Sequence, residues 1–196
     1  MPRDWLSARR SEVAADHILD AADSLFTQQN AATVGMHEIA AAAGCSRATL
    51  YRYFENREAL YTAYVHREAR RLYEEVSEQV ATVTDPAQRL IEGVITALRA
   101  VRVSPALSSW FATAQPPIGG EMAEHSEVIR ALVEGFVRSL AGETGQSDDV
   151  VGRRARWLVR VMVSLLVFPG VDEADERTML AEFVAPLVIP SGLRAQ

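Results

Sequence analysis

Apolar residues recur along this chain at intervals of three and four positions, and no stretch alternates strictly between apolar and polar residues. Intervals of three and four place side chains on one face of an α-helix, whereas strict alternation is typical of a strand. The pattern therefore predicts an all-α fold with about nine helices.

N-cap residues, prolines and glycines indicate where these helices begin and end. The expected starts are Ser11, Asp85-Pro86, Ser104-Pro105, the break at Gly119-Gly120, Asp148 and Asp172. The expected ends are Gly142 for a helix over 121–141, Pro169-Gly170 for a helix over 148–168, and Pro186 for a helix over 172–185.

Two short helices around a tight turn are predicted within residues 34–60, which read VGMHEIAAAAGCSRATLYRYFENREAL. Gly44 suits the left-handed backbone position that follows a helix end. Ser46 is a good N-cap for a second helix that runs to Phe54. Cys45, between them, is expected to be buried as a small apolar plug. The segment 35–54 is thus predicted to be a helix-turn-helix.

The second of these helices has one face for the core and one for a partner. Leu50 and Phe54 lie four residues apart, so both can be buried, which leaves Tyr51 and Arg52 exposed. Arg47 can donate two hydrogen bonds to a guanine, and hydroxyl groups suit phosphate oxygens. Arg57, in the first turn of the next helix, is expected to bind a phosphate. The candidate DNA-binding residues are His37, Ser46, Arg47, Ala48, Thr49, Tyr51, Arg52, Tyr53 and Arg57.

The charge of the chain is distributed in a way that permits DNA binding. The net charge is −6, but residues 1–70 hold 8 Arg against 9 acidic residues, whereas residues 71–196 hold 12 Arg against 17. Between residues 47 and 57 there are three Arg and one Glu. The local balance is therefore positive on the segment predicted to face DNA.

These residues resemble the DNA-binding head of the TetR family, whose pattern runs I-A, A-G, S-x-x-T-L-Y-x-Y-F, then a basic residue and L. The chain supplies Ile39-Ala40, Ala43-Gly44, Ser46, Thr49-Leu50-Tyr51, Tyr53-Phe54, Arg57 and Leu60. It departs from the family at three positions: Arg57 stands where Lys is usual, Gly35 where a Ser or Thr cap is usual, and Cys45 where Val is usual. The resemblance covers residues 11–72, and it implies that residues 73–190 form a ligand-binding and dimerisation domain.

The resemblance also implies a function. Family members are homodimeric transcription regulators, usually repressors, that bind a palindromic double-stranded DNA operator. Arg47, Ala48, Tyr51 and Arg52 would take positions near the bases, and Thr49, Tyr53 and Arg57 positions at the DNA backbone. Two alternatives stay open: a constitutive DNA-binding regulator without an inducer, and a helical interaction module.

Residues 148–168 are apolar nearly all round, which is expected of a helix buried between its own subunit and a partner. With the helix over 172–185 it would form the interface of a homodimer. Arg153, Arg156 and Arg160 lie along one side of this helix. Their expected partners are acids across the dimer, such as Glu173, Asp175 and Glu176, or alternatively a ligand carboxylate.

A cluster of aromatic and Met residues could line a cavity for a small apolar or amphipathic ligand, although such residues more often form core. Its members are Trp110, Phe111, Met122, Phe136, Trp157 and Met162.

Other functions find no support in the sequence. There is no phosphate-binding glycine loop or nucleophile elbow, and the four histidines show no metal-ligand spacing, so no enzyme activity, metal or cofactor is expected. The N-terminus has no apolar signal-peptide core, and the longest apolar stretch is too short and too polar to cross a bilayer. The protein is therefore expected in the cytoplasm, away from the membrane.

Overall fold

The computed structural model of the chain describes residues 4–108, 111, 126–141 and 147–189. Throughout these ranges the regular structure is helical and no strand occurs, which confirms the all-α prediction. None of the described helices combines the length and apolarity needed to span a membrane. The chain divides into two compact units, a head (Met1–Arg67) and a body (Glu68–Gln196).

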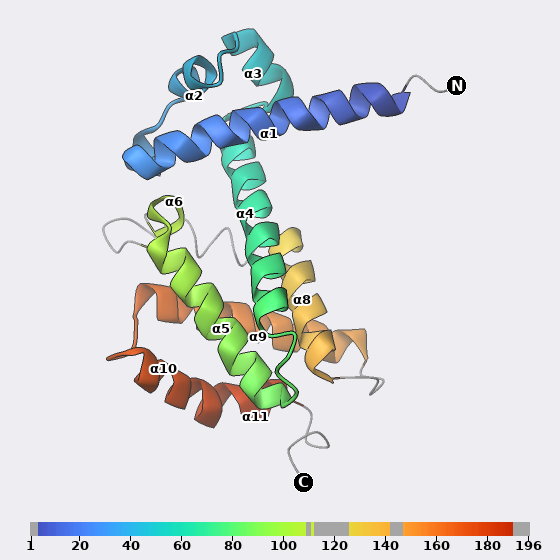
Figure 1. The fold of residues 1–196 in the computed structure, drawn as a ribbon, viewed down its shortest axis with the longest axis vertical. Helices are drawn as coiled ribbons and strands as arrows, with labels where there is room; N and C mark the ends of the chain where they lie inside the picture. Colours follow the sequence, from blue (N-terminus) through green and yellow to red (C-terminus); the bar gives the residue numbers. More distant parts are fainter. Residues whose placement is uncertain (1–3, 109–110, 112–125, 142–146, 190–196) are drawn as a thin grey trace. The chain divides into compact units, whose positions relative to one another are not determined.

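The head contains three helices, a 3₁₀ turn and the first part of a fourth helix (Figure 1). These are α1 (Asp4–Gln28), η1 (Ala31–Thr33), α2 (Met36–Ala42), α3 (Arg47–Tyr53) and α4 (Arg57–Gln79). α1 begins well before Ser11, so the start predicted from that cap residue was wrong. Residues 4–10 contain no helix breaker, and a serine inside a helix is tolerated when it is exposed, as Ser11 is.

α4 is fixed to α1 by an aromatic cluster and two polar contacts. The ring of Phe26 meets those of Tyr61 and Tyr64 edge to face, each at 5.1 Å between ring centroids. The Tyr64 hydroxyl donates to Asp23 Oδ1 at 2.5 Å, and Arg67 Nη1 donates to Asp20 Oδ1 at 2.8 Å. The head is thus closed by side chains from its first and last helices.

The body is built around α5 (Pro86–Val103), which contacts α8, α9 and α10. The other elements are α6 (Pro105–Ser108), α8 (Glu127–Ala141), α9 (Asp148–Val167), α10 (Glu173–Met179), η2 (Leu180–Val184) and α11 (Ala185–Val188). A Cβ on Gly93 would lie 2.5 Å from Phe136 Cζ, so the glycine allows Phe136 of α8 to pack directly on the backbone of α5.

Two helix boundaries in the body differ from those predicted. α8 begins at Glu127, after Ser126, whose Oγ accepts the N–H of Ile129 at 3.1 Å, whereas the start predicted at residue 121 lies outside the described residues. Pro186 does not end the last helix. Instead, the π-helical turn of η2 comes before it, and Pro186 lies in the first turn of α11, where its missing N–H leaves no hydrogen bond unmade.

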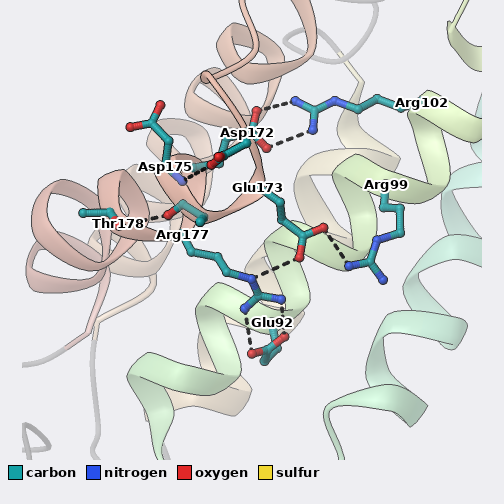
Figure 2. Close-up of polar contacts among 10 residues, drawn as sticks. Glu92, Arg99, Arg102, Asp172, Glu173, Asp175, Arg177 and Thr178 are labelled. Carbon is teal, nitrogen blue, oxygen red and sulfur yellow. Dashed lines mark hydrogen bonds and ion pairs between the residues drawn. The ribbon is translucent and has the colours of Figure 1, made fainter.

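A ladder of ion pairs joins α5 to α10 (Figure 2). Glu92 binds Arg177 through two hydrogen bonds of 2.8 and 3.0 Å, and Glu173 accepts from Arg177 at 3.1 Å and from Arg99 at 2.7 Å.

The buried member of this ladder is Glu176, which is 2% exposed. Its carboxylate accepts hydrogen bonds of 2.6 and 2.9 Å from Arg102 and one of 3.0 Å from the Gly170 N–H. Arg102 also donates to the Leu165 carbonyl at 2.8 Å, so it ties the end of α9 into the same contact.

We expect this ladder to make the stability of the body depend on pH. The hydrogen bonds from Arg177, Arg99 and Arg102 lower the pKa values of Glu92, Glu173 and Glu176, respectively. A lowered pKa in the folded state contributes stability that is present above the unfolded glutamate pKa of about 4.3 and is lost as the pH falls below it through the folded values.

Glu176→Gln should therefore lower the free energy of unfolding at pH 7 by about 1–3 kcal/mol, because it leaves the Arg102 guanidinium without its ionised partner. Denaturant unfolding at several pH values should also show that the free energy of unfolding of this variant falls less between about pH 5 and pH 3 than that of the unmodified protein. The exposed Glu173→Gln is the control and should cost less. Equal costs for the two variants would contradict this account.

Candidate nucleic-acid interface

The turn between α2 and α3 is closed by backbone hydrogen bonds that require a glycine. Gly44 has a φ of 62°, the left-handed region that other residues avoid. Its N–H donates to the Ala41 carbonyl at 3.1 Å, and the Cys45 N–H donates to the Ala40 carbonyl at 3.0 Å. This pair of bonds is the Schellman motif, which ends a helix and reverses the chain direction.

The caps at the starts of α2 and α3 fix these helices locally. Ser46 Oγ accepts the N–H of Thr49 at 3.0 Å, which confirms its predicted role as an N-cap. Gly35 has no hydroxyl, but its own N–H donates to Glu38 Oε2 at 2.8 Å. Glu38 thus supplies one half of a capping box, and the other half, a hydroxyl at the N-cap, is absent because Gly35 stands there.

The phase of α3 is as predicted. Leu50 is 0% and Phe54 is 7% exposed, whereas Tyr51 on the other side is 43% exposed. Of the remaining residues predicted to bind DNA, His37, Ser46, Arg47, Ala48 and Arg52 are exposed, and Thr49 and Tyr53 are half-buried. The Arg52 guanidinium lies 5.2 Å from the centroid of the Tyr53 ring, which keeps a cation beside a hydroxyl. The helix therefore presents cations, hydroxyls and an aromatic ring together.

Arg57 is placed differently from the rest of the predicted set. Asn56 Oδ1 accepts the N–H of Ala59 at 2.8 Å, so α4 begins with a capped turn as expected. Arg57 is exposed like most of that set, but its guanidinium folds back onto the head, where it donates to Tyr61 and to the Ala31 carbonyl. Sequence reasoning did not single out Tyr61, although its spacing of four residues from Arg57 places the two side chains on one face of a helix.

Cys45 was predicted to be buried, and it is half-buried. Ile39 of α2 and Leu50 of α3 are both completely buried.

Four of the six proposed ligand-binding residues lie within the described ranges, and they differ in burial. Phe136 is buried in the core and Met162 packs partly buried against it, which agrees with the alternative reading of these residues as core. Phe111 is half-buried in a turn, and Trp157 is 46% exposed. Trp110 and Met122 lie outside the described residues. Within the described ranges, no three His, Cys, Asp or Glu side chains come together in a way that could hold a metal ion.

The acids expected to meet the α9 arginines across a dimer are engaged within the chain. Glu173 and Glu176 belong to the ladder with α5, and Asp175 Oδ2 accepts the Val171 N–H at 3.0 Å. Arg153, Arg156 and Arg160 are exposed on α9.

The head therefore has the geometry of a helix-turn-helix DNA-binding protein, with α3 as the exposed second helix. Residues 18–64 match the family model described as "Bacterial regulatory proteins, tetR family". An uncharacterized HTH-type transcriptional regulator of Mycobacterium tuberculosis (strain CDC 1551 / Oshkosh) is 61% identical over 193 residues, which are 98% of this chain and 94% of that protein. The chain belongs to the TetR family.

Solved structures share the whole fold at lower identity. The TetR family repressor AlkX of Dietzia sp. strain DQ12-45-1b, implicated in biodegradation of n-alkanes, has a TM-score of 0.67 at 22% identity, and 88% of this chain and 93% of that chain are covered. The Thermus thermophilus repressor FadR, in complex with lauroyl-CoA, has a TM-score of 0.63 at 22% identity, with 93% and 96% covered. These likenesses show that the helical body, as well as the head, has the family's fold.

Proposed function

We propose that this protein is a cytoplasmic transcriptional repressor that binds a palindromic DNA operator as a homodimer and releases it when a small ligand binds the body. The observation that carries the proposal is the exposed side of α3, where two arginines and a tyrosine stand on a helix whose other side is buried at Leu50. The assignment to the TetR family supports DNA as the partner.

The dimensions of α3 suit the major groove. Its seven residues span about 10 Å at 1.5 Å per residue, and the major groove is about 12 Å wide. Arg47, in the first turn, would reach the base edges, with Ala48, Tyr51 and Arg52 beside it. Thr49 and Tyr53 would place hydroxyls at phosphates, together with Ser46 and His37.

Arg47→Ala should relax base preference at one position of each half-site, because only a guanidinium donates two hydrogen bonds to guanine O6 and N7. We expect a loss of about 1–3 kcal/mol against a duplex selected from a random pool, and little loss against duplexes altered at that position. Competition binding with single-base variants of the duplex measures this. Weakening by the same factor on every duplex would remove Arg47 from base recognition.

Homodimerisation is supported by large apolar side chains that one chain leaves exposed on its last helices. Trp157 of α9 is 46% exposed, Phe183 of η2 65% and Leu187 of α11 59%. Trp157 and Phe183 lie in the two segments predicted to form the interface, 148–168 and 172–185, and a second copy of the chain would remove this apolar surface from water. Two-fold symmetry would then present two α3 helices to half-sites roughly 34–36 Å apart.

Phe183→Glu should shift the protein toward monomers, because it places a charge inside the proposed interface, while the exposed position leaves the folded chain intact. Val13→Glu is the matched control, since Val13 is also 65% exposed but lies on α1. Sedimentation equilibrium of both variants measures the effect. Equal oligomeric states for the two variants would show that η2 lies outside the interface.

Ligand release would act through α4, which is one continuous helix from Arg57 to Gln79 and therefore belongs to both head and body. A ligand that binds the released state more tightly than the DNA-bound state would shift the population toward release. The lauroyl-CoA held by the Thermus thermophilus relative makes an amphipathic acyl compound the first class to test.

An acyl-CoA that raises the melting temperature of the protein should also weaken its binding to the selected duplex, because the two binding equilibria are linked. Thermal shift and fluorescence anisotropy over a series of acyl chain lengths measure the two effects. A compound that stabilises the protein but leaves DNA affinity unchanged would favour a constitutive regulator instead.

A further inference from the structure

Arg57 and Tyr61 form a compact hydrogen-bonded cluster in the first two turns of α4. Arg57 donates to the Tyr61 hydroxyl through Nε at 3.1 Å and through Nη2 at 2.9 Å. Nη2 also donates to the Ala31 carbonyl at 3.1 Å. The guanidinium carbon lies 4.8 Å from the centroid of the Tyr61 ring. The planar guanidinium is therefore held on one edge by a side chain of its own helix and by the backbone of η1.

The tyrosine extends this cluster to the segment that leads into α2. Its hydroxyl donates to the Ala31 carbonyl and lies 3.2 Å from the Val34 carbonyl. Ala31 and Val34 are both 0% exposed, and α2 begins two residues after Val34. Burial raises the pKa of Tyr61 further above neutral pH. The cluster thus fixes α4 to the backbone at the entrance to the helix-turn-helix.

The cluster also gives a physical reason for an arginine at a position where the family usually has lysine. A guanidinium can direct Nε and Nη2 at two acceptors in one plane, whereas a lysine ammonium is a point charge that lacks this fork. A phosphate contact would be served by either residue.

We propose that Arg57 and Tyr61 form a latch between α4 and η1 that sets the orientation of α2 and α3, and that Arg57 is a positioning residue for DNA recognition and not a phosphate ligand. The part of this proposal that concerns DNA rests on the proposed function. The latch itself is a property of the head alone, so it can be tested without DNA.

The test compares Arg57→Lys and Tyr61→Phe with the controls Arg70→Lys and Tyr73→Phe, which lie further along α4 and outside the residues proposed to bind DNA. Each pair keeps the charge or the ring and removes only the guanidinium fork or the hydroxyl. Affinity is measured on a duplex selected from a random pool and on a scrambled duplex, at a temperature where circular dichroism shows every variant fully folded. The measurements are repeated over a range of salt concentrations, and Arg57→Ala and the Arg57→Lys/Tyr61→Phe double variant are included.

The latch predicts that Arg57→Lys and Tyr61→Phe each weaken binding to the selected duplex about tenfold or more, with a smaller loss on the scrambled duplex. Because both variants break the same contact, the double variant should bind the selected duplex no more weakly than the weaker of the two single variants. Arg57→Ala should leave the slope of log K against log salt unchanged. A purely structural role would not lower the ratio of selected to scrambled affinity in fully folded protein.

Three results would overturn the latch. In the first, Arg57→Lys and Tyr61→Phe bind the selected duplex as tightly as the unmodified protein does, and in the second, the losses of the two single variants simply add in the double variant. In the third, Arg57→Ala reduces the slope of log K against log salt by about 1.8 for a dimer, as the loss of two phosphate contacts would. If the unmodified protein selects no duplex, the proposed function fails, and hydrogen exchange decides the latch. The amides of Val34, Glu38 and Ile39, which bond to Ala31 and Gly35 carbonyls, should then exchange faster in Tyr61→Phe. Unchanged exchange at these amides would overturn it.

Discussion

The burial of Leu50 is the constraint on which the rest of the interface depends. With this side chain and Phe54 held in the core of the head, α3 has a single rotational setting, and its other side must carry Arg47, Tyr51 and Arg52 outward. The Gly44 turn and the Ser46 cap fix where α3 begins, so the exposed residues are set in position along the helix as well as around it. Recognition chemistry is thus a consequence of core packing.

The same dependence on packing continues toward the body through α4. In the head, Tyr64 and Arg67 of α4 bind carboxylates of α1, and in the body Val76 joins the core with α5. This helix has partners in both units, and the proposed ligand response is assigned to it. The ion pairs from α5 to α10 stiffen the body, because their buried member, Glu176, is bound on several sides.

The local features that position α3 were predictable from the sequence, and contacts between distant segments were not. Gly44, Ser46 and the spacing of Leu50 from Phe54 are local signals, and the structure confirms each of them. The direction of Arg57 depends on a carbonyl 26 residues away, and the partner of Glu176 lies 74 residues away, so neither follows from helical periodicity. The acids that were expected to pair with arginines across a dimer are therefore bound within the chain.

The central claim is that α3 reads the sequence of double-stranded DNA. Its most direct test is selection by the unmodified protein from a pool of random duplexes, followed by sequencing of the retained fraction. The account predicts enrichment of an inverted repeat whose half-sites lie about one helical turn apart, in keeping with a two-fold dimer. Retention without any enriched sequence, or no retention at low salt, would contradict it.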